Sequence, residues 1–549
     1  MAFPLRHARL SPSGTASFGR IALPAAALAL PPLAAAAVPA QAWTRLAAQP
    51  ALLHSALLSL WTGLASTALA LAATVAILAL LHGRSAERWA GAPLVPLLAV
   101  PHAAFALGFA FLIAPSGWIV RLLSPEITGF QRPPDWPVPG DPFGLSLIGG
   151  LALRELPFLL LAALAAKARI GLVPLEASAR TLGCRPVEAF LRVGLPRIRG
   201  RIRLPVLAVL VYGTANVDMA AVLAPDLPAP LALRTVRWFF DPDPAGMDLA
   251  LAAVPLLAAL VAVAILLWRP LEEGLFALLE RGGRTTAACG LVALAVLALF
   301  GAGSLCALVL WALAGPWPFP DALPAALGTR TLELAAVDLA GTLRTTLLLA
   351  LAVAALAVAG ARLLLRPGGA PAPLVPLPLL PLFAPPVVVA PLLQRAALAL
   401  GAEGTVAAVA AGHLLYALPY ALLVLEGPVR RVPPPLFAAA RILGASPWRR
   451  FTELELPLLF PAFALAFATA LSVSFAQYET TLFLGGGRIR TLATETVAYL
   501  AAGDRQLAAC AGLLAALPPL LGFVPAALAV RRGLSRRAAA RTGPRCPPR

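Results

Sequence analysis

Long apolar stretches alternate with short arginine-bearing segments along this sequence, and that alternation limits the folds open to it. A helix that spans a lipid bilayer needs about 20 consecutive apolar residues. Twelve stretches are long enough, six in each half of the chain: 21–40, 55–81, 92–115, 143–166, 204–224, 249–268, 288–314, 343–365, 372–394, 405–426, 458–483 and 506–530. We therefore predict an all-α polytopic membrane protein with about twelve transmembrane helices.

The composition supports a membrane protein and argues against a nucleic-acid-binding one. Hydrophobic residues make up 60% of the chain and charged residues only 12%, which is unusual for a soluble domain. The net charge of +18 comes from arginines between apolar stretches, where membrane proteins keep positive charge. The five cysteines form no C-x-x-C pair, so they predict neither a disulfide framework nor a metal site. We expect contact with membrane lipid and none with nucleic acid.

The distribution of arginine also predicts the orientation. Nine basic residues lie within 167–203, whereas 116–142 and 226–248 are poorer in Arg and richer in Pro and Asp. Basic connecting segments normally face the cytoplasm, which puts both termini on that side of a bacterial inner membrane. The stretch 21–40 has a second interpretation as a cleaved signal peptide, since Ala40-Gln41-Ala42 resembles a cleavage site. We favour a retained first helix.

One basic segment occurs twice. Residues 174–205 and 435–461 share Ala-Arg-x-Leu-Gly, followed by Leu-Pro at the same distance, because Leu195 and Leu456 each lie 12 positions after the motif glycine. The two glycines, Gly183 and Gly444, are 261 positions apart. We call these segments the first and second repeated loops. Each is predicted to be two short helices joined by a turn at the glycine, with the second helix beginning at a proline.

The repeat predicts how the chain is divided. Two parallel six-helix repeats follow from an even number of spans in each half. We predict a first half at 1–268 with helices 1–6 and loop 174–205, and a cytoplasmic linker at 269–286. A second half at 287–530, with helices 7–12 and loop 435–461, and a basic cytoplasmic tail at 531–549 complete the chain.

An element repeated on the cytoplasmic face is typical of a docking surface for a partner. The alternative is an amphipathic helix on the lipid surface, which would not require the same glycine-to-proline spacing twice. The positions expected to matter for docking are Glu176, Ala177, Ala179, Arg180, Gly183, Leu195 and Pro196 in the first loop, and Ala438, Ala440, Arg441, Gly444, Leu456 and Pro457 in the second.

On these residues, both loops resemble the EAA motif of ABC-importer permeases, where the loop is a coupling helix seated in a groove of the ATPase. Two copies in one chain resemble the fused permeases of iron(III), thiamine and putative thiamine uptake systems. The resemblance implies a type I importer-like fold, an ATP-binding cassette ATPase dimer and a periplasmic or lipoprotein solute-binding protein as partners. The motif's opening Glu would fall at Ala177 and Ala438, so the sequence departs there; Glu176 lies one place earlier.

No G-x-x-x-x-G-K-[ST] loop occurs in the sequence. We therefore expect a transport subunit rather than an enzyme, with no cofactor of its own and with ATP and Mg²⁺ on the partner ATPase. An ion-coupled secondary transporter of twelve helices is the alternative, but it does not call for the repeated loop. A polytopic membrane enzyme would need a cluster of His, Ser or Asp that the sequence does not present.

Acidic residues inside apolar stretches indicate a translocation path, because charges within a membrane are costly and usually functional. Asp218 and Glu479 are again 261 positions apart. We interpret them as a pair that lines the path and favours a cation; the alternative is local pairing, for example with Arg237. Arg154 and Glu155 form either a gate or an ion pair, although neighbouring residues on a helix point in different directions.

The remaining polar features have mainly structural interpretations. His102 and His413 each sit alone in an apolar stretch and are expected to be packed or hydrogen-bonded rather than metal ligands. The loop 128–143, with Trp136, either contacts a binding protein or packs on its own spans. The resemblance points to thiamine-like or iron(III) substrates, with oxyanions and polyamines left open.

Overall fold

The structure, a computed structural model, describes residues 38–88, 90–91, 94–365 and 377–541. Most of the predicted first helix, 21–40, and the end of the basic tail therefore lie outside the described residues. Within the described part every extended regular element is a helix, and the only β pairing there is an isolated bridge between Ala314 and Leu327. The prediction of an all-α fold is confirmed.

The helices of the first half follow the apolar stretches, with shorter helices in the connections. Prolines divide the predicted stretch 92–115, because α5 begins directly after Pro101. The elements are α2 (Ala40–Ala47), α3 (Leu52–Leu81), η1 (Ser85–Arg88), α4 (Leu94–Ala99), α5 (His102–Ile113), α6 (Trp118–Leu123), α7 (Leu145–Ala168), α8 (Leu172–Thr181), α9 (Pro186–Ala189), the π turn η2 (Phe190–Gly194), α10 (Leu195–Thr214), α11 (Ala220–Leu223), α12 (Leu231–Phe239) and α13 (Pro244–Gly282).

The second half repeats much of this order. Its elements are α14 (Arg284–Val296), the π turn η3 (Leu297–Ala302), α15 (Gly303–Leu313), α16 (Arg330–Asp338), α17 (Ala340–Leu365), η4 (Leu377–Phe383), α18 (Pro386–Ala399), α19 (Val406–Arg430), α20 (Pro434–Ile442), α21 (Pro447–Arg449), the π turn η5 (Arg450–Glu455), α22 (Leu456–Phe475), α23 (Glu479–Gly485), α24 (Leu492–Ala501) and α25 (Arg505–Arg541). Both π turns that precede α10 and α22 occupy the same place in the repeat.

Nine helical segments of the described chain are long and apolar enough to cross a membrane, or ten if η4 and α18, bent by 118°, form one broken span. Helix α10 is not among them because it carries four arginines, but it occupies the place of α22 in the repeat. The count of twelve stays a prediction, since the first stretch is outside the described residues.

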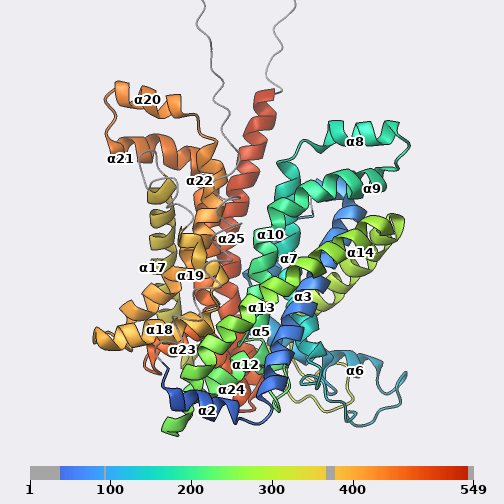
Figure 1. Cartoon of the computed structure of the whole chain (residues 1–549), viewed down its shortest axis with the longest axis vertical. Coiled ribbons are helices and arrows are strands. Elements are labelled where there is room, and N and C mark those ends of the chain that lie inside the picture. Colours follow the sequence, from blue (N-terminus) through green and yellow to red (C-terminus); the bar gives the residue numbers. More distant parts are fainter. Residues whose placement is uncertain (1–37, 89, 92–93, 366–376, 542–549) are drawn as a thin grey trace, which may run out of the picture.

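The two halves pack on each other in a related way (Figure 1). Within the halves, α3 packs on α7 and α10, and α17 packs on α19 and α22. Between the halves, α5 contacts α24 and α25, while α18 contacts α12 and α13. Helix α5 thus contacts α24 and α25 as its equivalent α18 contacts α12 and α13. This symmetry is expected for a parallel repeat.

Helices α14 and α15 belong to the second half by sequence but pack on α3 and α5 of the first. Small residues allow this close approach, as is common between membrane helices. A Cβ atom on Gly290 would lie 2.2 Å from the carbonyl oxygen of Ala76, and one on Gly108 would lie 2.1 Å from that of Ser304. The predicted linker 269–286 consists of the C-terminal part of α13, a turn at Gly283 and the start of α14.

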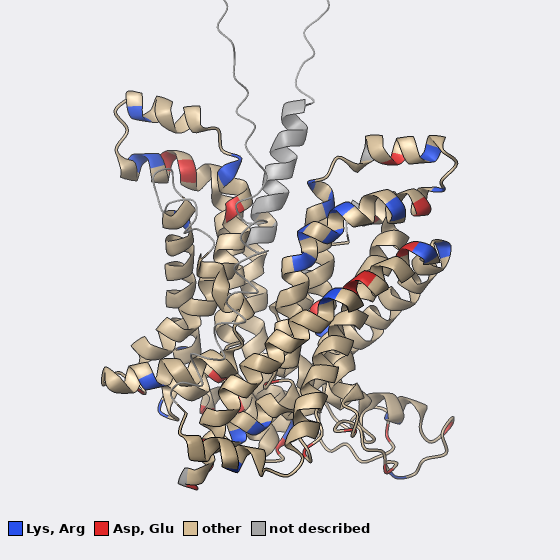
Figure 2. Ribbon diagram, in the orientation of Figure 1, with Lys and Arg blue, Asp and Glu red and all other residues tan. Residues whose placement is uncertain are grey.

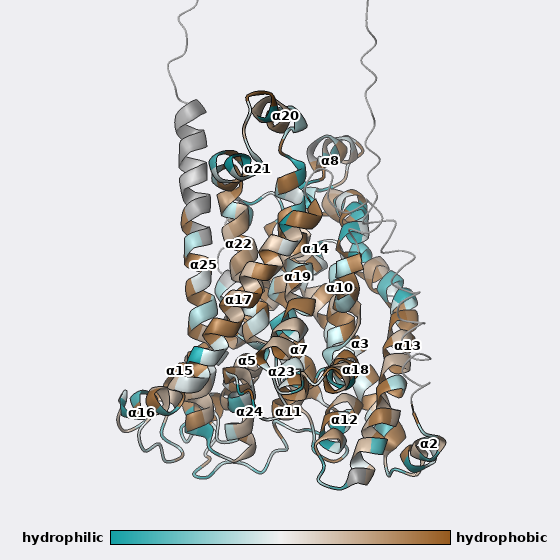
Figure 3. Cartoon of the chain, turned by 90° about the vertical axis from the view of Figure 1, so that its left-hand side faces the viewer, coloured by the Kyte–Doolittle hydropathy of each residue, from teal (hydrophilic) through white to brown (hydrophobic). Residues whose placement is uncertain are grey.

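The repeated loops lie at one end of the molecule, on two separate arms (Figure 1). We call this the loop end; α6, α12 and α24 lie at the opposite end. Many lysine and arginine residues lie on the arms of the loop end (Figure 2). Apolar residues dominate the long helices between the two ends (Figure 3). This separation of charged and apolar residues agrees with the alternation of apolar stretches and arginine-bearing segments in the sequence.

Candidate functional site

Both repeated loops fold as predicted, with two short helices joined at the glycine. Gly183 and Gly444 have φ angles of +87° and +75°, a backbone conformation that glycine adopts without a steric penalty. The amide that follows each glycine donates to the helix before it, from Cys184 to the carbonyl of Ala179 (3.2 Å) and from Ala445 to that of Ala440 (3.0 Å). The same turn therefore reverses the chain in both loops.

Apolar side chains at the tips of the loops are open to solvent. Leu182 is 86% exposed in the first loop, and Ile442, Leu443 and Trp448 are 86%, 85% and 71% exposed in the second. Large apolar side chains that gather on a surface usually mark an interaction site. The tips therefore have the character of a docking surface.

The motif residues divide into an outer and an inner set. Ala177, Arg180, Gly183, Pro196, Arg441, Gly444 and Pro457 are exposed, Ala438, Ala440 and Leu456 are half-buried, and Ala179 and Leu195 are buried. Glu176 faces inward, because its Oε2 atom lies 3.1 Å from Nε2 of His82 at the end of α3. That carboxylate is part of the internal contact of the loop.

A cluster of charged groups attaches the first loop to α3 and α7. Lys167 Nζ donates to Nδ1 of His82 (2.7 Å) and to the carboxylate of Glu87 (2.5 Å). The His82 ring stacks on Phe190 with centroids 4.5 Å apart. Burial, followed by the charge of Lys167, lowers the pKa of His82, although Glu176 and Glu87 oppose the shift. A neutral imidazole fits these contacts, accepting at Nδ1 and donating from Nε2.

The second loop is attached to α17 by an arginine in the corresponding place. Arg362 donates from Nε and from its terminal nitrogen to the two carboxylate oxygens of Glu455, at 3.0 and 2.8 Å. Its guanidinium lies 4.2 Å from the centroid of Phe451. A bidentate pair of this kind is both stronger and more directional than a single contact.

Asp218 and Glu479 lie where two spans of the repeat are broken. Asp218 is in the break between α10 and α11, and Glu479 begins α23 after the break that follows α22. Both carboxylates are more than nine-tenths buried and close enough for their charges to interact. Helices α11 and α23 lie nearer the opposite end than the loop end (Figure 3).

Asp218 is held by local donors rather than by a cation. Its Oδ1 accepts hydrogen bonds from Tyr212 Oη (2.8 Å), Asn216 Nδ2 (2.8 Å) and the amide of Met219 (2.9 Å). The alternative partner Arg237 is wrong, because its guanidinium pairs with Asp226 at 2.7 Å. Sequence reasoning missed Tyr212, which has no counterpart in the second half to draw attention to it.

The other polar residues of the spans are hydrogen-bonded to different elements. Arg154 donates to the carbonyls of Leu98 and Val100 (3.2 and 2.9 Å), while Glu155 contacts His102 at 3.1 Å. Arg154 and Glu155 therefore do not pair with each other. His413 bonds to Ser474 and Thr481, both at 2.8 Å, which confirms the hydrogen-bonded interpretation of the two histidines.

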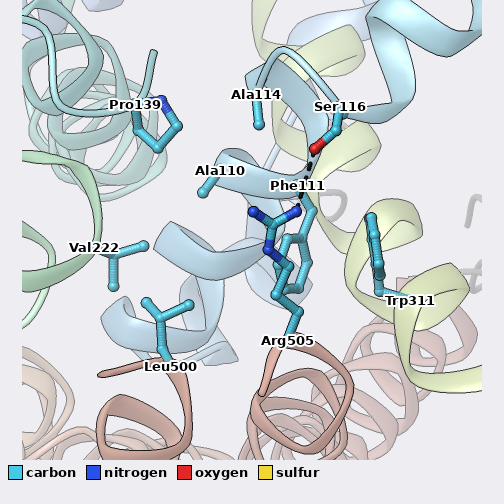
Figure 4. A pocket seen from close by; sticks show the side chains of 10 residues that line it. Ala110, Phe111, Ala114, Ser116, Pro139, Val222, Trp311, Leu500 and Arg505 are labelled. Carbon is cyan, nitrogen blue, oxygen red and sulfur yellow. Dashed lines mark hydrogen bonds between the residues drawn. The ribbon is translucent and has the colours of Figure 1, made fainter. Parts of the chain in front are cut away.

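A small pocket lies on the side away from the loops, between α5, the loop after it and the start of α25 (Figure 4). Its volume is about 120 Å³, and its lining is mostly apolar apart from Arg505 and Ser116. The Arg505 guanidinium donates to Ser116 Oγ at 3.2 Å, so this cation is already engaged. Among the described residues, no group of three or more His, Cys, Asp or Glu side chains could hold a metal ion.

Comparison with known proteins identifies the family. The chain is 30% identical over 505 residues to the inner membrane ABC transporter permease protein YnjC of Escherichia coli K12, covering 90% of this chain and 92% of that protein. Residues 372–534 match the family described as binding-protein-dependent transport system inner membrane component. The chain is an ABC transporter permease. No solved structure gave a significant match.

A shorter match concerns another ABC permease. Over 87 residues, 16% of this chain and 30% of that protein, it is 31% identical to the spermidine/putrescine transport system permease protein PotC homolog of Mycoplasma genitalium. ABC permeases of this family are multi-pass proteins of the bacterial inner membrane that work with an ATPase and a binding protein. The chain is therefore a transport subunit, and the geometry of its loops can be considered with such partners in mind.

Proposed function

We propose that this permease forms the translocation path of an importer and that its two repeated loops, as EAA-like coupling elements, dock on an ATP-binding cassette dimer. The observation that carries the proposal is the pair of exposed apolar tips, presented by the same glycine turn at both loops. The arginines at the loop end favour a cytoplasmic position for that end, and this orientation is part of the proposal. ATP and Mg²⁺ are bound by the partner.

The position of Glu176 bears on how the loops dock. Its carboxylate is occupied by His82, and the second loop has Phe437 at the equivalent place. Docking therefore rests on the exposed apolar tips and on the exposed Arg180 and Arg441, rather than on an acidic contact. A binding protein would meet the opposite end, where Trp136 is half exposed and stacks edge-on against Phe130.

The path passes the two broken spans, and its chemistry favours a cation. Two buried carboxylates whose charges interact are stabilised by positive charge between them. Thiamine-like and iron(III) substrates both meet this requirement. Spermidine and putrescine, named for one relative, are also cations and are included in the test.

The experiment is uptake by the permease reconstituted into proteoliposomes with its ATPase and binding protein. Radiolabelled thiamine, iron(III) carried by the binding protein, and spermidine are supplied in turn. For the cation that is taken up, Asp218→Asn and Glu479→Gln should abolish uptake while the ATPase still copurifies with the permease. Unchanged uptake in both variants would show that the acidic pair does not line the path. Uptake that does not need ATP would show that the permease is not part of an ATP-driven importer.

A further inference from the structure

Two aromatic rings occupy the same position in the repeat. Each lies against a histidine or arginine side chain at the loop end of a long helix, α3 in the first half and its equivalent α17 in the second. Phe190 and Phe451 are 261 positions apart, as are the two motif glycines. Phe190 stacks on His82, which follows α3, with an interplanar angle of 18°. Phe451 lies under the guanidinium of Arg362, in the last turn of α17.

A carboxylate completes the contact in both halves, although it comes from different elements. Glu176 of α8 bonds to His82, and Glu455 of the π turn η5 bonds to Arg362. The His82 imidazole and the Arg362 guanidinium are therefore each held by a phenylalanine ring on one side and by a glutamate carboxylate on another. In the second half a cation–aromatic contact is combined with a charge-assisted hydrogen bond. In the first half a neutral imidazole stacks on an aromatic ring and donates to a carboxylate.

The rings sit at the π turns, which are the points where the loops join the spans. Phe190 begins η2, and Phe451 is the second residue of η5. A π turn inside an α-helix is often found at functional positions. A force applied to α9 or α21 must pass through this turn to reach α10 or α22, and the ring connects the same turn to α3 or α17.

We propose that His82–Phe190–Glu176 and Arg362–Phe451–Glu455 are two braces, and that their members are positioning residues that make each loop move as one body with α3 or α17. This inference rests on the proposed function, since it assigns a route by which movement of the ATPase reaches the spans. The braces do not contact the substrate or the ATPase. Their loss should leave docking intact and separate loop movement from span movement.

The test measures distances between spin labels in the permease–ATPase complex in nanodiscs. With the native cysteines replaced by serine, labels are placed at the exposed residues Ala439 of α20 and Leu363 of α17. In the otherwise unchanged chain the distance distribution should be narrow and should stay so when MgATP is added. In Arg362→Ala and Phe451→Leu it should broaden, with ATP turned over about threefold or more per unit of transport.

Two further variants test whether the broadening comes from the lost contacts or from a general loss of structure. Phe451→Tyr keeps the ring and should keep the narrow distribution. Arg344→Ala removes an exposed arginine from the other end of α17 and should change nothing. Distributions in Phe451→Leu and Arg362→Ala that match the unchanged chain would overturn the braces.

A separate pair of labels distinguishes this failure from failure of the proposed function. Labels at Ala439 and Ser178, one on each loop, report whether the loops move relative to each other when MgATP is added. Movement between the loops with no effect of the brace variants refutes the braces alone. No movement between the loops during ATP hydrolysis would refute the coupling role itself.

Discussion

The two repeated loops share a backbone but differ in the side chains that they present and in how they are held. At equivalent positions the first loop has Thr181 and Val187, where the second has Ile442 and Trp448. The first loop is the more firmly attached to its own half, because Arg199 and Arg203 of α10 also lie 3.7 and 3.5 Å from the buried Glu272 of α13. The same glycine turn therefore presents different side chains to a partner in the two loops.

The corresponding positions on α22 explain part of this difference. Phe460 and Ala464 stand where α10 has Arg199 and Arg203, so α22 has no charged contact of this kind with α25. Helix α13 also turns at Gly283 into α14, whose start lies close to α9. The first loop is thus supported by the connection between the halves, whereas the second relies mainly on Arg362. We expect the second loop to contribute more to docking and the first to be more constrained.

The largest effect is expected at the tips. Trp448→Ala should weaken binding of the ATPase by about 2–4 kcal/mol, because large aromatic side chains dominate interface energies. Val187→Ala should cost about 1 kcal/mol or less. Binding of the purified ATPase to the permease in nanodiscs measures both. Leu266→Ala, at an exposed position of α13, is the matched control and should leave binding unchanged. Equal losses of binding free energy in Trp448→Ala and Val187→Ala would show that the two loops do not differ in docking.

A smaller effect is expected at the turns. Gly183→Val and Gly444→Val force a β-branched residue into positive φ, at a cost of about 1–3 kcal/mol each. A Cβ atom would meet no neighbour within 4 Å at either glycine, so strain rather than a clash is responsible. Uptake per ATP hydrolysed, measured with the cation that the reconstituted permease takes up, should fall in both variants.

The control for the turns is Gly200→Val in α10. Gly200 is also free of neighbours within 4 Å but has ordinary helical geometry, so uptake should be retained. Transport that persists in both turn variants would show that these loops are not coupling elements. Loss in Gly444→Val alone would indicate that the stronger attachment of the first loop tolerates the strain.

Local features of the fold could be predicted from the sequence. The spans follow from runs of apolar residues, and the turns follow from Gly183 and Gly444, because both depend on neighbours in the chain. The breaks beside Asp218 and Glu479 could not be predicted in the same way. Polar residues such as Asn216 and Gln477 do occur there, but polar residues within a span do not by themselves show that the helix ends. The packing of α14 on α3 depends on Gly290 meeting the Ala76 backbone, which is a tertiary contact.

The contacts that attach the two loops to α3 and α17 also could not be predicted from the sequence. His82 and Arg362 are different residue types, and neither is aligned by the offset that relates the glycines. Phe190 and Phe451 do share that offset, and this was the available signal. Its place near the motif predicts that Glu176 is a docking residue, whereas in the structure its carboxylate is directed to His82. Burial and direction of side chains decide such roles, and composition does not reveal them.

The smallest expected effect is a dependence on pH that only the first loop shows. The contacts of His82 require a neutral ring, and burial and Lys167 lower its pKa from 6.5. The folded loop therefore binds a proton less readily than the released loop, and its attachment loses stability as pH falls through about 6.5. The attachment of the second loop, made by Arg362, Phe451 and Glu455, contains no histidine, so the second loop should not respond.

Spin labels at Ser178 and Arg84 measure the first attachment, and labels at Ala439 and Leu363 measure the second. Between about pH 7.5 and about pH 5.5 the first distance distribution should broaden and the second should stay constant. His82→Gln should remove the dependence, because an amide can accept from Lys167 and donate to Glu176 without titrating. The other charges that act on His82 are Glu176 and Glu87, and broadening that survives in His82→Gln would assign the effect to those carboxylates instead.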